Sequence, residues 1–225
     1  MIGVLVSGEG SNLQALIDAG LPLSCVVSNR PGIRALARAR VAGIDAAVFE
    51  LSDYPDRERR DTAMADWLVE RGVELVVLAG YMHLLSEPFL SRFPDRIVNV
   101  HPSLLPEFPG AHAIDDALAA SVETTGVTVH LVDAGLDTGP VLAQEPVPVE
   151  PSETLVERIH AVEHRLLPEV VRDLCGADLT MRSEPSGRAG RHARASSVAP
   201  IVSAIEAPCV LRAHSPITPR RRATS

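Results

Sequence analysis

The first twenty residues, MIGVLVSGEGSNLQALIDAG (residues 1–20), decide the fold class of this chain. Ile2–Val6 is a short apolar run that predicts a buried strand. Ser11–Ala19 has a helical pattern, and Gly20 follows it as a C-terminal stop. A strand that passes through a short glycine turn into a helix is the opening unit of an α/β protein with a parallel sheet.

The same alternation continues along the first half of the chain. Further strands are predicted at Leu23–Ser28, Ala46–Glu50, Glu74–Ala79 and Arg96–Val100, with helices at Pro31–Gly43 and Asp53–Gly72 and a short helix capped by Ser86. The second half predicts a helix at Ile114–Val122, two hairpin-like strands at Gly126–Val132 and Val141–Val149, and a long helix at Ser152–Cys175. We therefore expect an open, mostly parallel, Rossmann-like sheet of about seven strands flanked by helices.

The composition agrees with one sizeable core. The 225 residues are 46% hydrophobic but only 3% aromatic, so Val, Leu, Ile and Ala must build that core. No run of about 18 apolar residues occurs, so no membrane-spanning helix is expected. The N-terminus lacks the basic segment of a signal peptide, and the spacing of the three cysteines matches no zinc pattern. These features predict a cytoplasmic protein without a metal site.

Charge divides the chain into two parts. All 21 basic residues are arginines, and residues 182–225 hold eight of them against two acidic residues, although the whole chain has a net charge of −8. The acidic body argues against general nucleic-acid binding. We expect residues 1–182 to form the folded domain and residues 183–225 to be a basic, disordered tail. Contact of this tail with a nucleic acid or a protein partner remains an alternative.

The glycine turn after the first strand is a candidate phosphate site. Backbone N–H groups at a helix N-terminus bind anions, and Gly10, Ser11 and Asn12 stand at that point. The turn is not a full dinucleotide motif, because Leu13 occupies the third glycine position. It is not a Walker A loop, because the chain has no lysine. The alternative is a plain turn capped by Ser11.

Polar residues at the end of the fifth strand are candidates for catalysis. Asn99 and His101 alternate along the strand and so point to the same side, at the carboxyl end where open α/β sheets bind ligands. Together they can polarise a carbonyl group and hold an oxyanion. Asp137, between Gly135 and Gly139, could orient the imidazole of His101. The alternatives are a structural histidine and a turn aspartate bonded to its own backbone.

Several motifs then identify a family resemblance that covers residues 1 to about 180. The motifs are SGEGSNLQ (7–14), AGYMHLL (79–85), NVHPSLLPEFPG (99–110), GVTVH (126–130) and LDTG (136–139). In this order and spacing they resemble the phosphoribosylglycinamide formyltransferases, a branch of the folate-dependent formyltransferases. The resemblance implies transfer of the formyl group of 10-formyltetrahydrofolate to the amine of 5-phosphoribosylglycinamide in de novo purine biosynthesis. It implies small-molecule substrates, no metal, no nucleic acid or membrane partner, and a monomer or a homodimer.

The resemblance also assigns roles to particular residues. It implies that Asn99 and His101 hold the oxyanion and that His101 donates a proton with the help of Asp137. The implied ribonucleotide-binding residues are Gly10, Ser11, Asn12 and Glu163. The implied folate-binding residues are Arg57, Met82, His83, Leu84, Leu85 and Asn99. In this chain His83 stands where the family commonly has arginine, Leu167 replaces a frequent tyrosine, and Asp178–Arg182 looks like the first strand of a terminal hairpin.

Three other functions fit parts of this pattern. One is a related hydrolase that releases formate, and another is a transferase that acts on methionyl-tRNA. We expect neither, because the chain begins directly at a strand and its tail is short for an added domain. The third is a phosphate-binding module without catalysis, which an activity assay distinguishes from an enzyme.

Overall fold

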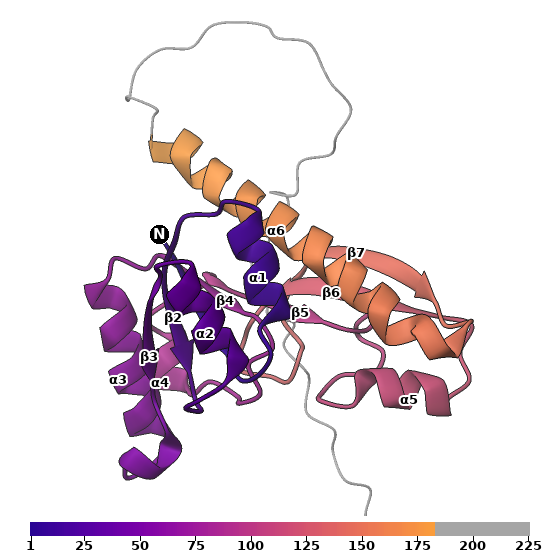
Figure 1. Ribbon diagram of the computed structural model, residues 1–225, viewed down its shortest axis with the longest axis horizontal. Coiled ribbons are helices and arrows are strands. Elements are labelled where there is room, and N and C mark those ends of the chain that lie inside the picture. Colours follow the sequence, from indigo (N-terminus) through magenta and orange to yellow (C-terminus); the bar gives the residue numbers. More distant parts are fainter. Residues whose placement is uncertain (183–225) are drawn as a thin grey trace, which may run out of the picture. The chain divides into compact units, whose positions relative to one another are not determined.

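The structure is a computed structural model that describes residues 1–182, with side chains described through Gly176. It contains one seven-stranded sheet in the order β3-β2-β1-β4-β5-β6-β7 (Figure 1). The strands are β1 (Ile2–Val6), β2 (Leu23–Ser28), β3 (Asp45–Val48), β4 (Leu75–Leu78), β5 (Ile97–His101), β6 (Thr124–Leu131) and β7 (Val141–Pro148). The first five are parallel, and β6 runs antiparallel to both of its neighbours. The predicted fold class is confirmed.

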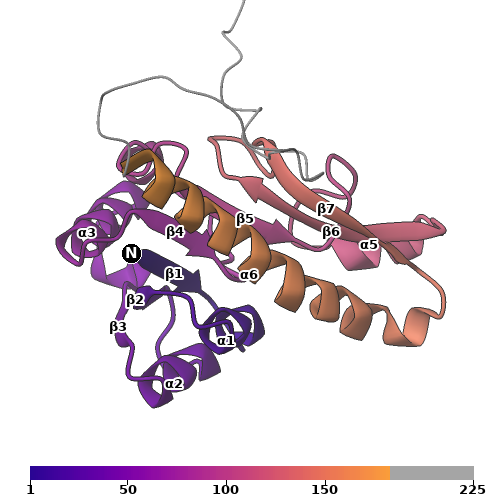
Figure 2. The same cartoon turned by 90° about the horizontal axis from the view of Figure 1, so that it is seen from above.

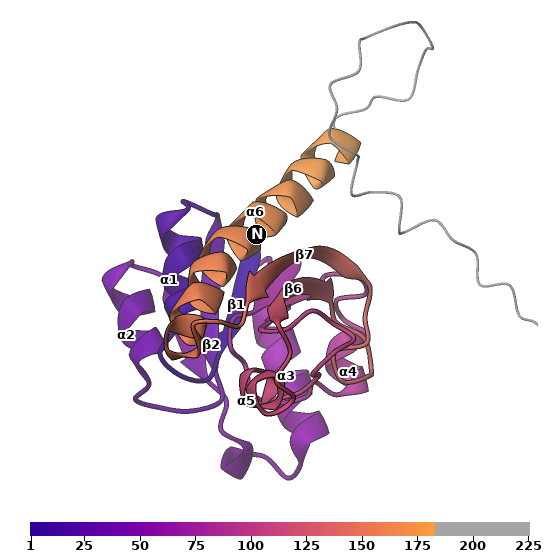
Figure 3. The ribbon, with the colours of Figure 1, turned by 90° about the vertical axis from the view of Figure 1, so that its right-hand side faces the viewer.

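Helices cover both faces of this sheet. They are α1 (Ser11–Asp18), α2 (Arg34–Val41), α3 (Arg57–Glu70), α4 (Glu87–Leu90), α5 (Ala113–Ala119) and α6 (Leu155–Arg182), with short 3₁₀ turns at Leu51–Asp53 and Ser152–Thr154. One core cluster lies between the sheet and α1, α2 and α6, and a second lies between the sheet and α3 and α4 (Figure 3). Figure 2 shows the long α6 lying across the sheet.

Strand β1 explains how the sequence fills both clusters. All five of its residues are buried, and side chains alternate between the faces of a strand. Ile2, Val4 and Val6 therefore join the cluster beneath α1 and α6, whereas Leu5 joins the cluster beneath α3. A strand buried on both faces is a continuous apolar run.

Several expected elements differ from the structure, most of them by a few residues at their ends. Asp178–Arg182 is not a strand, because α6 continues to Arg182. A single strand without a partner leaves its backbone N–H and C=O groups unpaired, whereas a continued helix satisfies them. The helix expected from Pro31 begins at Arg34 after a turn at Gly32, and the edge strand expected at Ala46–Glu50 lies at Asp45–Val48.

The strand order creates a binding position at the carboxyl ends of the strands, where the order reverses between β1 and β4. From β1 the chain moves to β2 and β3 on one side and then to β4 and β5 on the other. At such a reversal the loops after neighbouring strands separate, and ligands bind outside the carboxyl ends.

Within the described residues, no helix is long and apolar enough to cross a membrane. The prediction of a disordered tail concerns residues 183–225, which lie outside the described part.

Candidate active site

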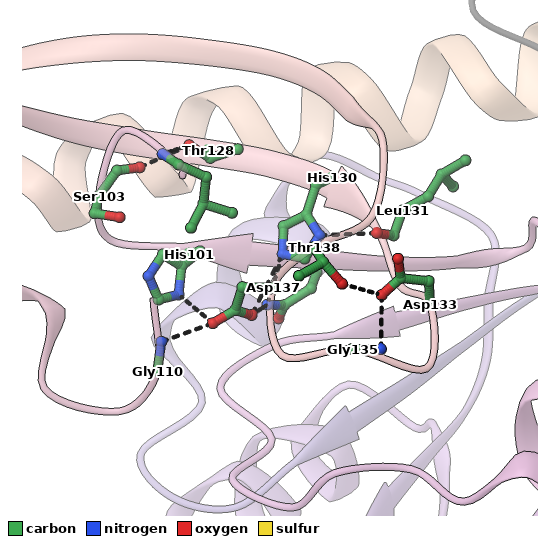
Figure 4. Close-up of polar contacts among 12 residues, drawn as sticks. His101, Ser103, Gly110, Thr128, His130, Leu131, Asp133, Gly135, Asp137 and Thr138 are labelled. Carbon is green, nitrogen blue, oxygen red and sulfur yellow. Dashed lines mark hydrogen bonds and ion pairs between the residues drawn. The ribbon is translucent and has the colours of Figure 1, made fainter. Parts of the chain in front are cut away.

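Asn99, His101 and Asp137 converge at the carboxyl end of β5. Asn99 and His101 lie two residues apart on β5, and Asp137 lies in the loop between β6 and β7. Its Oδ2 atom is 3.5 Å from Nδ1 of His101, and its Oδ1 atom is 3.4 Å from Nδ2 of Asn99. In Figure 4 the carboxylate of Asp137 lies between His101 and His130. The structure thus brings together the three residues that the sequence singled out.

The loop that carries Asp137 is held by its own hydrogen bonds. Asp137 has a left-handed backbone, with φ of 55°. Asp133 accepts hydrogen bonds from the backbone N–H of Gly135 at 2.9 Å and from the hydroxyl of Thr138 at 2.7 Å. The N–H of Gly110 donates to Oδ2 of Asp137 at 2.8 Å. These contacts aim the carboxylate at β5 rather than at solvent.

The imidazole of His101 is fixed on both sides. Its Nε2 atom lies 2.8 Å from the carbonyl oxygen of Phe108, which can only accept, so Nε2 carries a hydrogen. On the other side Nδ1 faces the Asp137 carboxylate. Only a ring with hydrogens on both nitrogens donates to both partners. The ring is therefore held between the Phe108 carbonyl at Nε2 and the Asp137 carboxylate near Nδ1.

The proline-rich loop after His101 is anchored to the sheet. Thr128 on β6 donates its hydroxyl hydrogen to the carbonyl of Ser103 at 2.6 Å and accepts from the N–H of Leu105 at 3.1 Å. Gln144 on β7 donates to the carbonyl of Leu105 at 2.8 Å. The loop is therefore ordered around the Phe108 carbonyl that holds His101.

His130 belongs to this cluster, and the sequence reasoning did not single it out. It is paired with Asn99 across the antiparallel strands β5 and β6 and is 1% exposed. Its Nδ1 atom lies 2.8 Å from the carbonyl oxygen of Leu131, and its Nε2 atom lies 3.1 Å from Nδ2 of Asn99 and 3.6 Å from Oδ1 of Asp137. The available signal was alternation along GVTVH, which puts Thr128 and His130 on one face.

The state of His130 decides which end of the Asn99 amide faces outward. Nδ1 must donate to the Leu131 carbonyl, so a neutral ring accepts at Nε2 and engages the NH₂ group of Asn99. A proton on Nε2 would instead suit the amide oxygen, and the NH₂ group would then be free for a ligand. Amide orientation follows from the hydrogen-bond network in this way.

Asp137 is held in its ionised form. The His130 imidazole, whose Nε2 lies 3.6 Å from Oδ1, lowers the pKa of the carboxyl most, and the Gly110 N–H and the charge of His101 lower it further against the opposing effect of burial. A carboxylate is therefore present throughout the neutral range.

Among the described residues, no group of three His, Cys, Asp or Glu side chains could hold a metal ion.

A cavity of about 220 Å³ opens beside the three residues. Asn99, His101, His130 and Asp137 line one side of it, and Tyr81–Leu85 and Gly135–Leu136 line much of the rest. Met82 and Leu84 are 69% and 54% exposed, so apolar side chains stand uncovered at its wall. A concave apolar site with a few convergent polar groups is typical of ligand binding.

The expected folate-binding residues are divided by the structure. Met82, His83, Leu84 and Leu85 all line this cavity, together with Asn99. Arg57 does not line it. Arg57 is the exposed first residue of α3, and its charge acts on His83.

The expected ribonucleotide-binding residues lie at the start of α1 and on α6. Gly10 adopts a left-handed backbone, and the first turn of α1 has no side-chain cap, which leaves N–H groups without helical partners. Asn12 Nδ2 donates to Oε2 of Glu163 at 3.1 Å, and both residues are buried. Burial raises the pKa of Glu163. The cavity beside Asp137 is not lined by any of these residues, Gly10, Ser11, Asn12 and Glu163.

A larger hollow lies elsewhere. It has a volume of about 540 Å³ and runs between α1 and α6, where Ser11, Arg38, His164 and Arg172 are among its lining residues. None of the residues around Asp137 reaches it. The smaller cavity is the candidate active site, because Asn99, His101 and Asp137 line it together.

Comparison with known proteins gives a consistent family. Residues 1–171 match the formyl transferase family model. The phosphoribosylglycinamide formyltransferase of Mycobacterium tuberculosis is 45% identical over 194 residues, which are 82% of this chain and 90% of that protein. The trifunctional purine biosynthetic protein adenosine-3 of Drosophila pseudoobscura pseudoobscura is 43% identical over 194 residues, and the chain spans only 14% of its length.

Solved structures of the same kind share the fold. Glycinamide ribonucleotide transformylase 1 from Symbiobacterium toebii has a TM-score of 0.76 and 46% identity, covering 78% of this chain and 87% of that chain. Phosphoribosylglycinamide formyltransferase from Streptococcus pneumoniae has a TM-score of 0.74 and 42% identity, covering 77% of this chain and 97% of that chain. This chain belongs to the formyl transferase family.

Proposed function

We propose that this chain transfers the formyl group of 10-formyltetrahydrofolate to the amine of 5-phosphoribosylglycinamide, as a step of de novo purine biosynthesis in the cytoplasm. The observation that carries the proposal is the convergence of Asn99, His101 and Asp137 on one side of a cavity walled by Met82–Leu85. Residues 1–182 form the catalytic domain in this proposal. The substrates are small molecules, and no resident metal takes part.

Asn99 and His101 act on the formyl carbonyl. The amine nitrogen attacks the formyl carbon, a new C–N bond forms, and the carbonyl oxygen becomes an oxyanion. Hydrogen-bond donors aimed at that oxygen stabilise the transition state, and one such donor is typically worth about 10²–10³-fold in turnover. Asn99 supplies its NH₂ group after turning away from His130, which requires a proton on Nε2 of that ring.

His101 and Asp137 move the protons. His101 donates a proton to the folate nitrogen as the bond between that nitrogen and the formyl carbon breaks, and the ionised Asp137, which faces Nδ1, assists this donation. The proton lost by the attacking amine passes to Asp137 through an ordered water. General acid–base catalysis of this kind contributes about 10²–10⁴-fold.

The start of α1 binds the ribonucleotide phosphate. Its unpartnered N–H groups and the positive end of the helix dipole favour an anion, and Gly10 gives the backbone its close turn. Ser11 and Asn12 add side-chain donors. Glu163, bonded to Asn12, accepts hydrogen bonds from the glycinamide ribonucleotide.

An assay with both substrates tests the function. We expect formyl transfer that requires glycinamide ribonucleotide and 10-formyltetrahydrofolate, followed through the absorbance of the released folate.

His101→Ala should lower kcat by about 10²–10⁴-fold with an unchanged circular dichroism spectrum. Asn12→Ala should raise KM for the ribonucleotide more than KM for the folate. Release of formate without the ribonucleotide would identify a hydrolase, and binding without turnover would identify a binding module.

A further inference from the structure

A buried ion pair supports the cavity wall from behind. Arg60 on α3 is fully buried, and its guanidinium donates to Oδ1 of Asp61 from Nε at 2.9 Å and from Nη2 at 2.6 Å. Oδ2 of Asp61 accepts from the N–H of Ser86 at 2.8 Å. The third guanidinium nitrogen, Nη1, lies 3.0 Å from Nδ1 of His83. The pair therefore contacts both ends of the segment from His83 to Ser86.

The contact between Arg60 and His83 fixes the hydrogen on the imidazole. A guanidinium has donors and no acceptor, so Nδ1 of His83 must accept. The ring is then neutral and carries its hydrogen on Nε2, at the edge that faces away from Arg60. Burial lowers the pKa of His83, and the charges of Arg60, Arg30 and Arg57 lower it further, while Asp61 alone opposes them.

His83 also lines the cavity beside Asp137, and no hydrogen-bond partner of its Nε2 occurs within the described residues. A neutral donor held at a known orientation in a cavity wall is suited to an acceptor oxygen of a ligand. An arginine at this position would instead bring a charge.

We propose that Arg60 is a positioning residue that holds His83, a member of the expected folate-binding segment, as a neutral Nε2–H donor to a carbonyl or carboxylate oxygen of the folate co-substrate. The proposal rests on the proposed function. Nδ1 protonation at low pH removes the acceptor for Arg60 and adds a charge beside three arginines, so the arrangement requires the neutral ring.

Kinetics with three variants test the role of His83. His83→Gln keeps an acceptor for Arg60 and a donor for the ligand, so KM for 10-formyltetrahydrofolate should stay within about threefold. His83→Phe keeps a ring but no hydrogen bond, and should raise that KM about tenfold at a nearly unchanged kcat, in line with loss of one hydrogen bond. His112→Phe, at an exposed histidine outside the cavity, is the control and should change neither constant.

The same assay locates the acceptor. With 10-formyltetrahydropteroate, which lacks the glutamate tail, a persisting effect of His83→Phe assigns the acceptor to the ring portion of the folate, and a lost effect assigns it to the tail carboxylates. Equal KM values for His83→Phe and the unchanged protein would overturn the proposal. Because the unchanged protein is assayed alongside, absence of formyl transfer there would instead contradict the proposed function.

A spectroscopic measurement tests the part played by Arg60. Long-range ¹H–¹⁵N correlation spectra should show the Nε2–H form of His83, with a titration midpoint below the usual 6.5. In the double variant Arg60→Met/Asp61→Asn, which removes both charges and keeps an acceptor for Ser86, the midpoint should rise towards 6.5. An Nδ1–H form, or a midpoint that does not move, would overturn the positioning role.

Discussion

Glu163 is a residue held where its ionisation is unfavourable. It is 6% exposed on α6, and burial raises its pKa above the usual 4.5 despite the hydrogen bond from Asn12 and the charge of His160. The folded protein therefore binds this proton more tightly than the unfolded chain does. The resulting contribution to stability is complete below pH 4.5 and is lost as the pH rises through the folded pKa. At neutral pH the ionised carboxylate lowers the free energy of unfolding.

Glu163→Gln should therefore raise the melting temperature at pH 7, because the amide oxygen of glutamine still accepts a hydrogen bond from Asn12 and carries no buried charge. The difference from the unchanged protein should shrink towards pH 4.5. The same variant should raise KM for the ribonucleotide about tenfold, since it removes a charged acceptor. Thermal unfolding at both pH values and initial-rate kinetics measure the two effects. A lower melting temperature at pH 7 would contradict this account of Glu163.

At the scale of single residues, what the sequence could predict depended on local motifs. Asn99 and His101 lie on one strand and could be paired from its alternation, but the part of Asp137 was implied only by the family resemblance, because the glycine signals fit a turn aspartate equally well. His130 was missed because its role depends on the antiparallel register that pairs it with Asn99. The hydrogen bond between Asn12 and Glu163 joins positions 151 residues apart, and the helical periodicity of α1 or of α6 carries no information about it.

At the scale of elements, the turn between β1 and α1 is determined by one glycine. Gly10 has φ of 72°, and a Cβ atom there would lie 2.6 Å from Cβ of Ala35 on α2. Both the left-handed backbone and the close approach of α2 therefore exclude a side chain. Gly20, at the other end of α1, has a similar φ of 67° but open space around it.

These two glycines form a matched pair for substitution. Gly20→Ala should destabilise the fold by about 1–2 kcal/mol through its backbone alone. Gly10→Ala should add about 1–3 kcal/mol of steric strain and should also raise KM for the ribonucleotide, because the turn at the start of α1 must shift. Chemical denaturation and kinetics provide both values. Equal destabilisation by the two substitutions would show that α2 yields to the added methyl group.

Element boundaries were predicted best for β1 and β2, whereas β4, which is buried along its whole length, was predicted one residue too long at each end. β1 and β2 were predicted at their observed limits, because parallel strands in the centre of the sheet are apolar and end at polar or turn residues. Edge strand β3 is largely exposed, and its limits shifted. The helix expected to stop at Cys175 runs through Gly176 to Arg182, since a single glycine costs only about 1 kcal/mol in a helix.

At the scale of the whole molecule, the proposed site uses the loops that follow β1, β4, β5 and β6. Ser7 links the loops after β1 and β4, because its hydroxyl accepts from the N–H of Met82 at 3.0 Å, and the same hydroxyl donates to Asn29 after β2 at 2.7 Å. A rigid sheet below such loops keeps reacting groups in register. Every residue assigned a role lies at or before Glu163, and the family match ends at residue 171.

Removal of residues 183–225 should therefore leave formyl transfer intact. A chain ending at Arg182 keeps the sheet, the full α6 and all proposed contacts, so we expect kcat/KM for both substrates within about threefold of the full chain at ~0.15 M salt, where long-range attraction by the arginine-rich segment is largely screened. Circular dichroism of both proteins controls for folding. A tenfold loss of kcat/KM in a truncated chain with an unchanged spectrum would assign the last 43 residues, numbers 183–225, a direct part in binding or turnover.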